Sequence, residues 1–244
     1  TDPGVPLLLT AGTPYVGAAR GTVQEVYTQM EKDIDQSIAY LKNASSPDNK
    51  SNISINAAYG IKARIALSRG NWSVAAANAA LARTGFPLLN ETQWDSGFNT
   101  YDLPEVIWGG RVIDAESAFF SSYFYYVAFA FNGSQNRSNP KLISKELYDA
   151  IPATDFRNKA WLPKAPNTNG AASNGQGGSF ATDPNYSDKA SFDAAKAAII
   201  AKYGATSGHN THPYMNVKFK QKNPGSIDPD DVIYMRSAEM YLIE

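Results

Sequence analysis

Hydrophobic residues recur at helical intervals between Thr22 and Leu41, the first strongly periodic stretch of the chain. A helix over this stretch would carry its apolar side chains on one face, at Val23, Val26, Tyr27, Met30, Ile34, Ile38 and Leu41. Glu25 stands three residues after Thr22, so these two residues can form a capping box at the start of the helix. The residues before Thr22 are rich in Thr, Gly and Pro and predict an extended or looped segment.

A second periodic stretch, from Asn56 to Leu89, predicts two short helices joined by a tight turn. Gly70 predicts the end of the first helix, and Asn71 predicts the cap of the second. Gly85 and Pro87 predict the end of the pair. Small residues on both facing stripes would let two antiparallel helices approach closely.

The spacing of this helix pair resembles the tetratricopeptide repeat of about 34 residues. The positions whose order and spacing correspond to the repeat are Tyr59, Ala63, Ala66, Gly70, Trp72, Ala75, Ala79, Ala82 and Pro87. Lys62 and Ala79 depart from the repeat, which usually has leucine and phenylalanine there. One such unit cannot bury its own apolar face, so neighbouring helices are expected to cover it, with Trp72 packed at the inner seam. An ordinary helical hairpin is the alternative interpretation.

Beyond Pro87 the helical period gives way to aromatic and polar residues. Trp94, Phe98 and Tyr101 stand among Asp, Asn and Gly, and a short extended element is expected at Arg111–Ile113. The aromatic residues are then densest at Phe119, Phe120, Tyr123, Phe124, Tyr125, Tyr126, Phe129 and Phe131. Such crowding exceeds what one buried face usually needs.

Four further elements are predicted in the second half of the chain. They are a short helix over Leu142–Ile151, a long and mobile surface loop over Pro163–Ser191, a strand over Tyr214–Lys220 and a last helix over Val232–Glu244. All the elements together predict a mainly α fold, in which tetratricopeptide-like helical hairpins pack with long irregular loops and a few short strands.

The same patterns divide the chain into three stretches. Residues 1–91 would hold the N-terminal loop and the tetratricopeptide-like helices, and residues 92–230 a loop-rich aromatic ligand-binding region. Residues 231–244 would be the first helix of a further pair, because they repeat the spacing of the first repeat helix. We expect these stretches to form one structural domain that is an internal portion of a longer protein.

Composition narrows the possible partners. The net charge of −1 and the pI near 6.1 leave no basic surplus to neutralise a phosphate backbone, which argues against nucleic acid. The absence of cysteine excludes disulfides, thiolate metal sites and cysteine nucleophiles from this segment. No run of about 18 apolar residues is present, so no membrane-spanning helix is expected. Any signal peptide is expected to lie outside the segment.

Groups that act in catalysis or metal binding lack the sequence context that such chemistry needs. His209 and His212 lie in a Gly/Asn/Pro loop without a placed carboxylate. Asp228, Asp230 and Asp231 fit either a calcium site or a turn and cap before the last helix. A glycosidase pair depends on separation in space, which the sequence does not give for its candidates Asp114, Glu116 and Asp155. The sequence therefore predicts no enzyme, cofactor or metal site.

The sequence favours a sugar-binding surface instead. Sugar rings present apolar C–H faces that stack on Tyr and Trp, and their hydroxyls bond with Asn, Gln, Asp and Arg. The first candidates are Tyr123, Tyr125 and Tyr126 for stacking and Asn132, Asn136 and Arg137 for hydrogen bonds. The next candidates are Trp94, Tyr101 and Trp161. Tyr123 would share a face with Tyr126 in a helix and with Tyr125 in a strand. The alternative is that many of these aromatic side chains are core.

Three combinations of segments resemble the SusD/RagB family of outer-membrane nutrient-binding lipoproteins from Bacteroidetes. They are Gly4–Leu7 with Thr22–Tyr27 and Ile34–Ile38, Asn56–Arg64 with Gly70–Trp72, and Glu146–Arg157 with Asp231–Tyr241. The resemblance implies a non-catalytic, surface-exposed lipoprotein of the outer membrane. It also implies binding of an oligosaccharide or polysaccharide and its delivery to a TonB-dependent, SusC-like transporter. The lipidated cysteine of the family is not in this segment, so membrane association is expected only through an anchor outside it. A helical-repeat scaffold for peptide or protein ligands is the alternative function.

Overall fold

The computed structural model describes residues 2–11, 17–113, 115, 122–168 and 180–244, which form two compact units. The first unit contains Thr1–Leu88, Pro104–Gly109 and Tyr234–Glu244, and the second contains Leu89–Leu103 and Gly110–Ile233. The boundaries predicted after residues 91 and 230 stay predictions. The expectation of one structural domain stays a prediction.

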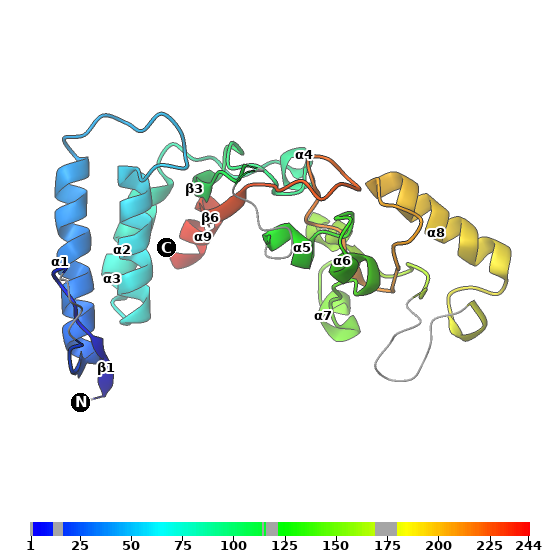
Figure 1. The fold of residues 1–244 in the computed structure, drawn as a ribbon, viewed down its shortest axis with the longest axis horizontal. Helices are drawn as coiled ribbons and strands as arrows, with labels where there is room; N and C mark the ends of the chain where they lie inside the picture. Colours follow the sequence, from blue (N-terminus) through cyan, green and yellow to red (C-terminus); the bar gives the residue numbers. More distant parts are fainter. Residues whose placement is uncertain (1, 12–16, 114, 116–121, 169–179) are drawn as a thin grey trace. The chain divides into compact units, whose positions relative to one another are not determined.

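The first unit begins with a strand pair and a long helix (Figure 1). β1 (Pro3–Pro6) pairs antiparallel with β2 (Arg20–Thr22), and α1 (Val23–Leu41) follows directly. The predicted capping box is confirmed. The Thr22 hydroxyl accepts a hydrogen bond from the Glu25 amide at 3.1 Å, and the Glu25 carboxylate accepts one from the Thr22 amide at 2.7 Å. These bonds satisfy amides that the first helical turn leaves without intrahelical partners.

The predicted helix pair is also present, as α2 (Ile55–Ser68) and α3 (Trp72–Arg83), beside α1 in Figure 1. Gly70 ends α2 at a φ of +72°, in the left-handed region that favours glycine. Asn71 occupies the N-cap of α3, but its side chain makes no capping bond and its carbonyl accepts from the Ala75 amide. Fully buried small side chains allow the close packing, at Ala57, Ala63, Ala75, Ala79 and Ala82.

The expectation that Trp72 packs at the inner seam is wrong. The Trp72 side chain is 67% exposed at the start of α3, and its ring lies over the turn at Gly70. Alanines occupy the buried face of the helix pair, and helices that approach this closely leave no space for an indole between them. In this chain, residue 72 therefore does not have the seam-packing role that the repeat pattern gives to this position.

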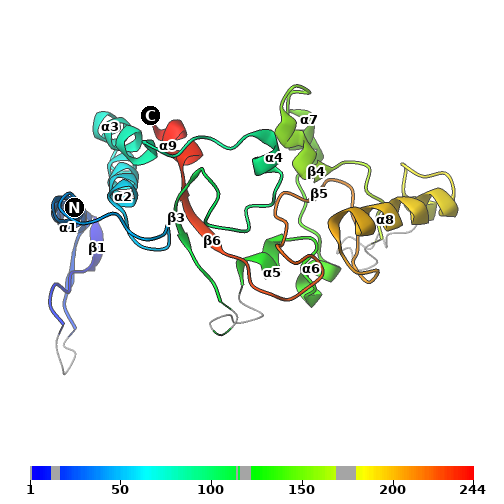
Figure 2. The same ribbon diagram turned by 90° about the horizontal axis from the view of Figure 1, so that it is seen from above.

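The prediction of one helix over Val232–Glu244 is wrong in its first part. β6 (Val232–Arg236) pairs with β3 (Val106–Gly110), and α9 (Ser237–Ile243) begins only after it. Figure 2 shows the two strands side by side. The β-branched Val232 and Ile233 favour a strand once β3 supplies a partner. α9 packs against α3 and α2 and buries Met240, so it covers the helix pair as the repeat implied.

The second unit consists of short helices, short strands and connecting loops. Its α-helices are α4 (Glu91–Trp94), α5 (Tyr123–Val127), α6 (Ser134–Ser138), α7 (Lys145–Asp149) and α8 (Lys189–Tyr203). Two 3-10 turns span Phe156–Ala160 and Phe180–Thr182, and β4 (Trp161–Leu162) pairs antiparallel with β5 (Met215–Asn216). The predicted mainly α fold with irregular loops and a few short strands is confirmed. None of the helices in the described ranges is long and apolar enough to cross a membrane.

Helix α8 is missing from the sequence-based prediction, although both of its ends carry a signal. The Asp188 carboxylate accepts from the Ser191 amide at 2.8 Å, and Gly204 ends the helix at a φ of +67°. In contrast, α7 and β5 are shorter than the helix and strand predicted around them. The centre of the predicted loop Pro163–Ser191, including Gly175–Gly178, lies outside the described residues, so its mobility stays a prediction.

Candidate functional site

Two of the predicted stacking residues, Trp94 and Trp161, line one cavity in the second unit. Trp94 is the last residue of α4, and Trp161 is the first residue of β4. The cavity has a volume of about 340 Å³, and its other lining residues are Ile151, Asp155, Arg157, Ala160 and Lys218. Both indoles are half-buried, so each packs against the protein while it lines the cavity.

Aromatic neighbours fix the position of the Trp94 ring. Phe98 meets it edge-on at a centroid distance of 5.7 Å, and Phe156 does so at 5.2 Å, both with an interplanar angle of 88°. The Lys218 ammonium lies 5.5 Å from the centre of the same ring. Edge-on packing of this kind is the favoured arrangement of aromatic pairs. Trp94 therefore offers a rigid apolar surface to whatever occupies the cavity.

An ion pair stands at the polar side of the cavity lining. The Asp155 carboxylate accepts from the Arg157 backbone amide at 3.0 Å and from the guanidinium Nε at 2.9 Å. The hydrogen bonds from the Arg157 side chain, and next the bond from its backbone amide, hold the pKa of Asp155 below its usual value. The bonds between the two side chains also raise the pKa of Arg157. Asp155 is therefore ionised at neutral pH and unsuited to the role of a glycosidase general acid. Asp114 and Glu116 lie outside the described residues.

The first candidates for stacking, Tyr123, Tyr125 and Tyr126, lie on helix α5. In a helix, Tyr123 shares a face with Tyr126 and not with Tyr125. Tyr123 and Tyr126 are 43% and 46% exposed, whereas Tyr125 is only 9% exposed. The Tyr125 ring packs edge-on against Tyr126 and Phe131, at centroid distances of 4.9 and 5.8 Å. Phe124 and Phe131 are fully buried, as the core interpretation of the phenylalanines expected. The structure thus presents Tyr123 and Tyr126 to solvent and gives Tyr125 a packing role.

The polar candidates after α5 are also divided between surface and interior. Asn136 is buried, and its amide donates to the backbone oxygens of Phe124 at 2.8 Å and Ala128 at 2.7 Å. These bonds tie α6 to the end of α5. Arg137 is exposed, and Asn132 is half-buried. Asn136 consequently stabilises the aromatic segment, whereas Arg137 remains on the surface.

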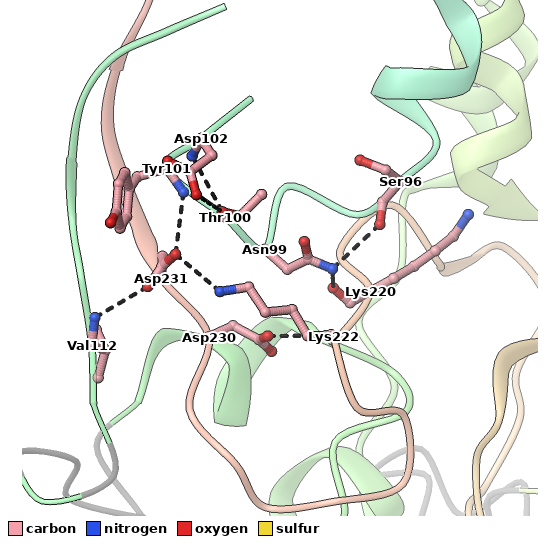
Figure 3. A network of polar contacts seen from close by, with 10 residues as sticks. All are labelled: Ser96, Asn99, Thr100, Tyr101, Asp102, Val112, Lys220, Lys222, Asp230 and Asp231. Atoms are coloured by element: carbon pink, nitrogen blue, oxygen red, sulfur yellow. Dashed lines mark hydrogen bonds and ion pairs between the residues drawn. The ribbon is translucent and has the colours of Figure 1, made fainter. Parts of the chain in front are cut away.

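A second cavity, lined by Tyr101, contains an acidic network (Figure 3). The Asp231 carboxylate is buried and accepts from the Tyr101 amide at 3.3 Å, the Val112 amide at 3.2 Å and the Lys222 ammonium at 3.0 Å. Asp230 accepts from the Lys222 amide at 3.0 Å, and burial raises its pKa to about 6. The predicted cap before a last helix is therefore wrong. Both carboxylates precede a strand. Asp231 cross-links loops that are distant in the sequence, whereas Asp230 binds an amide eight residues away.

The two histidines have no metal partner group among the described residues, which contain no set of three His, Asp or Glu side chains arranged around an ion. His209 is fully buried, and its ring nitrogens lie 3.2 Å from the Phe131 carbonyl oxygen and 2.9 Å from the Thr206 hydroxyl. Burial is the main cause that lowers the pKa of His209. His209 therefore serves the packing of its loop, a role that the sequence pattern did not reveal.

Comparisons with known proteins identify the fold of the chain. Residues 3–67 match the family model of SusD-like proteins described as "Starch-binding associating with outer membrane". A SusD-like carbohydrate binding protein from Bacteroides vulgatus aligns with 99% of the chain at 20% identity and a TM-score of 0.68. The chain has a SusD-like fold. The resemblance to the SusD/RagB family predicted from the sequence is thereby confirmed.

Two other solved structures of SusD-like proteins also align with the chain. A laminarin binding SusD-like protein aligns with 98% of the chain at 19% identity and a TM-score of 0.57. A SusD superfamily protein from Bacteroides thetaiotaomicron aligns with 99% of it at 13% identity and a TM-score of 0.60. The chain spans about half the length of these structures, covering 44% of the first, 53% of the second and 46% of the third. No match was found among curated protein sequences.

Lys218 lines the tryptophan cavity of this SusD-like chain, although no sequence pattern links it to Trp94 or Trp161. The pairing of β4 with β5 sets Asn216 opposite Trp161, and Lys218 follows two residues later. A pairing of two-residue strands leaves no periodic signal in the sequence. Asp155 and Arg157, in contrast, were visible within a segment that carries the family resemblance, but their ion pair was not predicted.

Proposed function

We propose that this SusD-like chain binds neutral oligosaccharides in the cavity lined by Trp94 and Trp161. The observation that carries the proposal is the union of two indoles and the Asp155–Arg157 ion pair in one cavity of the second unit. Indole faces complement the apolar C–H faces of pyranose rings, and charged groups donate to and accept from sugar hydroxyls. Such a mixture of apolar walls and a few polar groups is typical of small-molecule sites.

The family match supports a glycan as the ligand class. The model that matches residues 3–67 is described as starch-binding, and a similar solved structure is named as laminarin binding. Starch and laminarin are both neutral glucans, so a glucan oligosaccharide is the first ligand to test. The same matches support a binding protein rather than an enzyme.

The wider role follows from the family resemblance. We propose that the protein containing this chain is a lipoprotein on the outer surface of the bacterial outer membrane. There it would capture glycans and pass them to a TonB-dependent, SusC-like transporter. The phrase "associating with outer membrane" in the family description supports the location. Co-purification of the transporter with the tagged full-length protein tests the partnership, and its failure under mild detergent would argue against it.

Calorimetry on paired tryptophan variants tests the binding site. Maltoheptaose and laminarihexaose are titrated into the parent chain, Trp161→Ala and Trp72→Ala. Trp72 is the matched control because its exposed indole lies in the first unit. Loss of an indole from a binding site costs about 2 kcal/mol or more, which is a decrease in affinity of about thirtyfold. We expect this loss in Trp161→Ala only. Equal affinity in the parent and Trp161→Ala would refute the site.

A further inference from the structure

The second cavity of the second unit, which contains Tyr101, differs in chemistry from the tryptophan cavity. Its volume is about 780 Å³, within the range of about 300 to 1,000 Å³ common for ligand sites. Its described lining includes Tyr101, Asp102, Arg111, Ile113 and Lys222. Tyr101 and Ile113 give it apolar surface, and the two cations give it hydrogen-bond donors.

Asp231 holds the walls of this cavity in place. Its carboxylate binds the backbone amides of Tyr101 and Val112, on two chain segments, and the ammonium of Lys222 on a third (Figure 3). The Asp231 side chain is only 5% exposed, and these three donors bind its oxygens within the wall. The carboxylate therefore holds the cavity walls together, and it belongs to the cavity lining with these three donors already bound.

Arg111 is available to a ligand. Its side chain is exposed and lines the cavity, and it makes no hydrogen bond or ion pair with any residue in the described part of the chain. Arg157 in the tryptophan cavity is engaged by Asp155 instead. The two cavities consequently differ in whether their arginine is already neutralised.

The donors in the cavity outnumber the acceptors. A guanidinium carries five N–H donors, and an ammonium carries three, of which Lys222 uses one on Asp231. Asp102 contributes an exposed carboxylate to the lining, which acts as a hydrogen-bond acceptor. This carboxylate accepts a hydrogen bond from the Thr100 hydroxyl at 3.5 Å. A donor-rich site requires a ligand rich in acceptors, and a planar guanidinium binds a carboxylate with two parallel hydrogen bonds.

We infer that this cavity binds a carboxylate-bearing sugar, a uronic acid residue of a glycan, with Arg111 and Lys222 on the carboxylate and Tyr101 against the ring. The inference rests on the proposed function because it presupposes a sugar ligand. It adds a second site with a different chemical preference. A glycan that carries both neutral and acidic residues would then meet a suitable site for each.

The test compares trigalacturonate with its fully methyl-esterified form, which has the same ring and no charge. Calorimetry at low salt is expected to give about ten- to a hundredfold tighter binding of the acid, the usual advantage of hydrogen bonds to a charged group. High salt should reduce this preference, because the lining cations are exposed to screening. Arg111→Gln is expected to bring the acid close to the ester in affinity.

Arg69→Gln is the matched control, since it removes the same charge from the first unit, where Arg69 pairs with Glu31. It should keep the preference for the acid. Equal binding of acid and ester by the parent, or an undiminished preference in Arg111→Gln, would overturn the inference. Neutral-glucan binding is measured on the same proteins. Its absence from the parent would refute the proposed function, whereas its presence beside equal acid and ester binding would refute only the second site.

Discussion

Gly60 of helix α2 lies against Met235 of strand β6 within the first unit. An alanine Cβ at this position would lie 2.1 Å from the Sδ atom of Met235 and 2.7 Å from its Cε atom. Met235 is only 1% exposed, and Met240 Sδ stands 3.5 Å from the same Cβ. The methionine end therefore has little free space into which it can move, and Gly60→Ala must displace buried atoms.

The expected cost follows from two opposing effects. Overpacking of a buried site costs about 1 to 3 kcal/mol, and a Cβ at 2.1 Å belongs at the upper end of that range. Alanine has a better helix propensity than glycine by about 1 kcal/mol, which offsets part of this cost. Gly60→Ala should therefore lower the free energy of unfolding by about 2 kcal/mol.

Urea denaturation followed by far-UV circular dichroism measures this difference. Gly85→Ala is the control, because a Cβ there would meet no atom within 4 Å and only its φ of +87° is unfavourable. That variant should lose about 1 kcal/mol through backbone strain alone. Met235→Ala should cost less in the Gly60→Ala background than in the parent, because it removes the clash. A Gly60→Ala chain as stable as the parent would refute the packing of β6 against α2.

Three further predictions concern other residues. Asp230→Asn should stabilise the chain at pH 7.5 by about 1 to 2 kcal/mol after allowance for solvent screening. In the parent the pKa of Asp230 is raised from 3.8 to about 6, so unfolding free energy should fall as pH rises from about 4 to 6, and the variant should lack this fall. Asn136→Ala should cost about 1 to 3 kcal/mol, because it removes two buried hydrogen bonds of about 0.5 to 1.5 kcal/mol each, while the Phe124 and Ala128 carbonyls keep backbone amides as donors. A loss below about 0.5 kcal/mol in urea denaturation would contradict this. Trp72→Ala should change the free energy of unfolding by no more than about 0.5 kcal/mol, because the Trp72 ring is exposed. A loss of about 3 kcal/mol would mean that the ring is packed at the inner seam of the helix pair.

Local signals in the sequence predicted much of the first unit. The capping box at Thr22 and Glu25 and the left-handed stop at Gly70 depend on residues within one helical turn, so a reader of the sequence can find them. The strand β6 depends on a partner that lies far earlier in the chain, so the local pattern of Val232–Arg236 alone predicts a helix. The same limit applies to Trp72, because the burial of its side chain depends on whether another helix packs over it, and the local sequence does not show this.

The candidate site was predictable in residue type but not in grouping. Aromatic crowding pointed to α5, yet the sequence did not separate exposed Tyr123 and Tyr126 from packed Tyr125. Trp94 and Trp161 are recognisable in the sequence as aromatic candidates, but only the fold brings them to one cavity. Lone aromatic residues in irregular loops carry no periodicity from which their neighbours can be inferred.

Fluorine NMR of the chain labelled with 5-fluorotryptophan tests the central claim most directly. The sequence contains four tryptophans, so four resonances are expected and single substitutions assign them. Trp72 and Trp108 lie in the first unit, and Trp94 and Trp161 line the cavity in the second. On addition of maltoheptaose or laminarihexaose, the resonances of Trp94 and Trp161 should shift together with ligand concentration, while those of Trp72 and Trp108 stay in place. Binding detected by calorimetry without a shift of Trp94 or Trp161 would contradict the account.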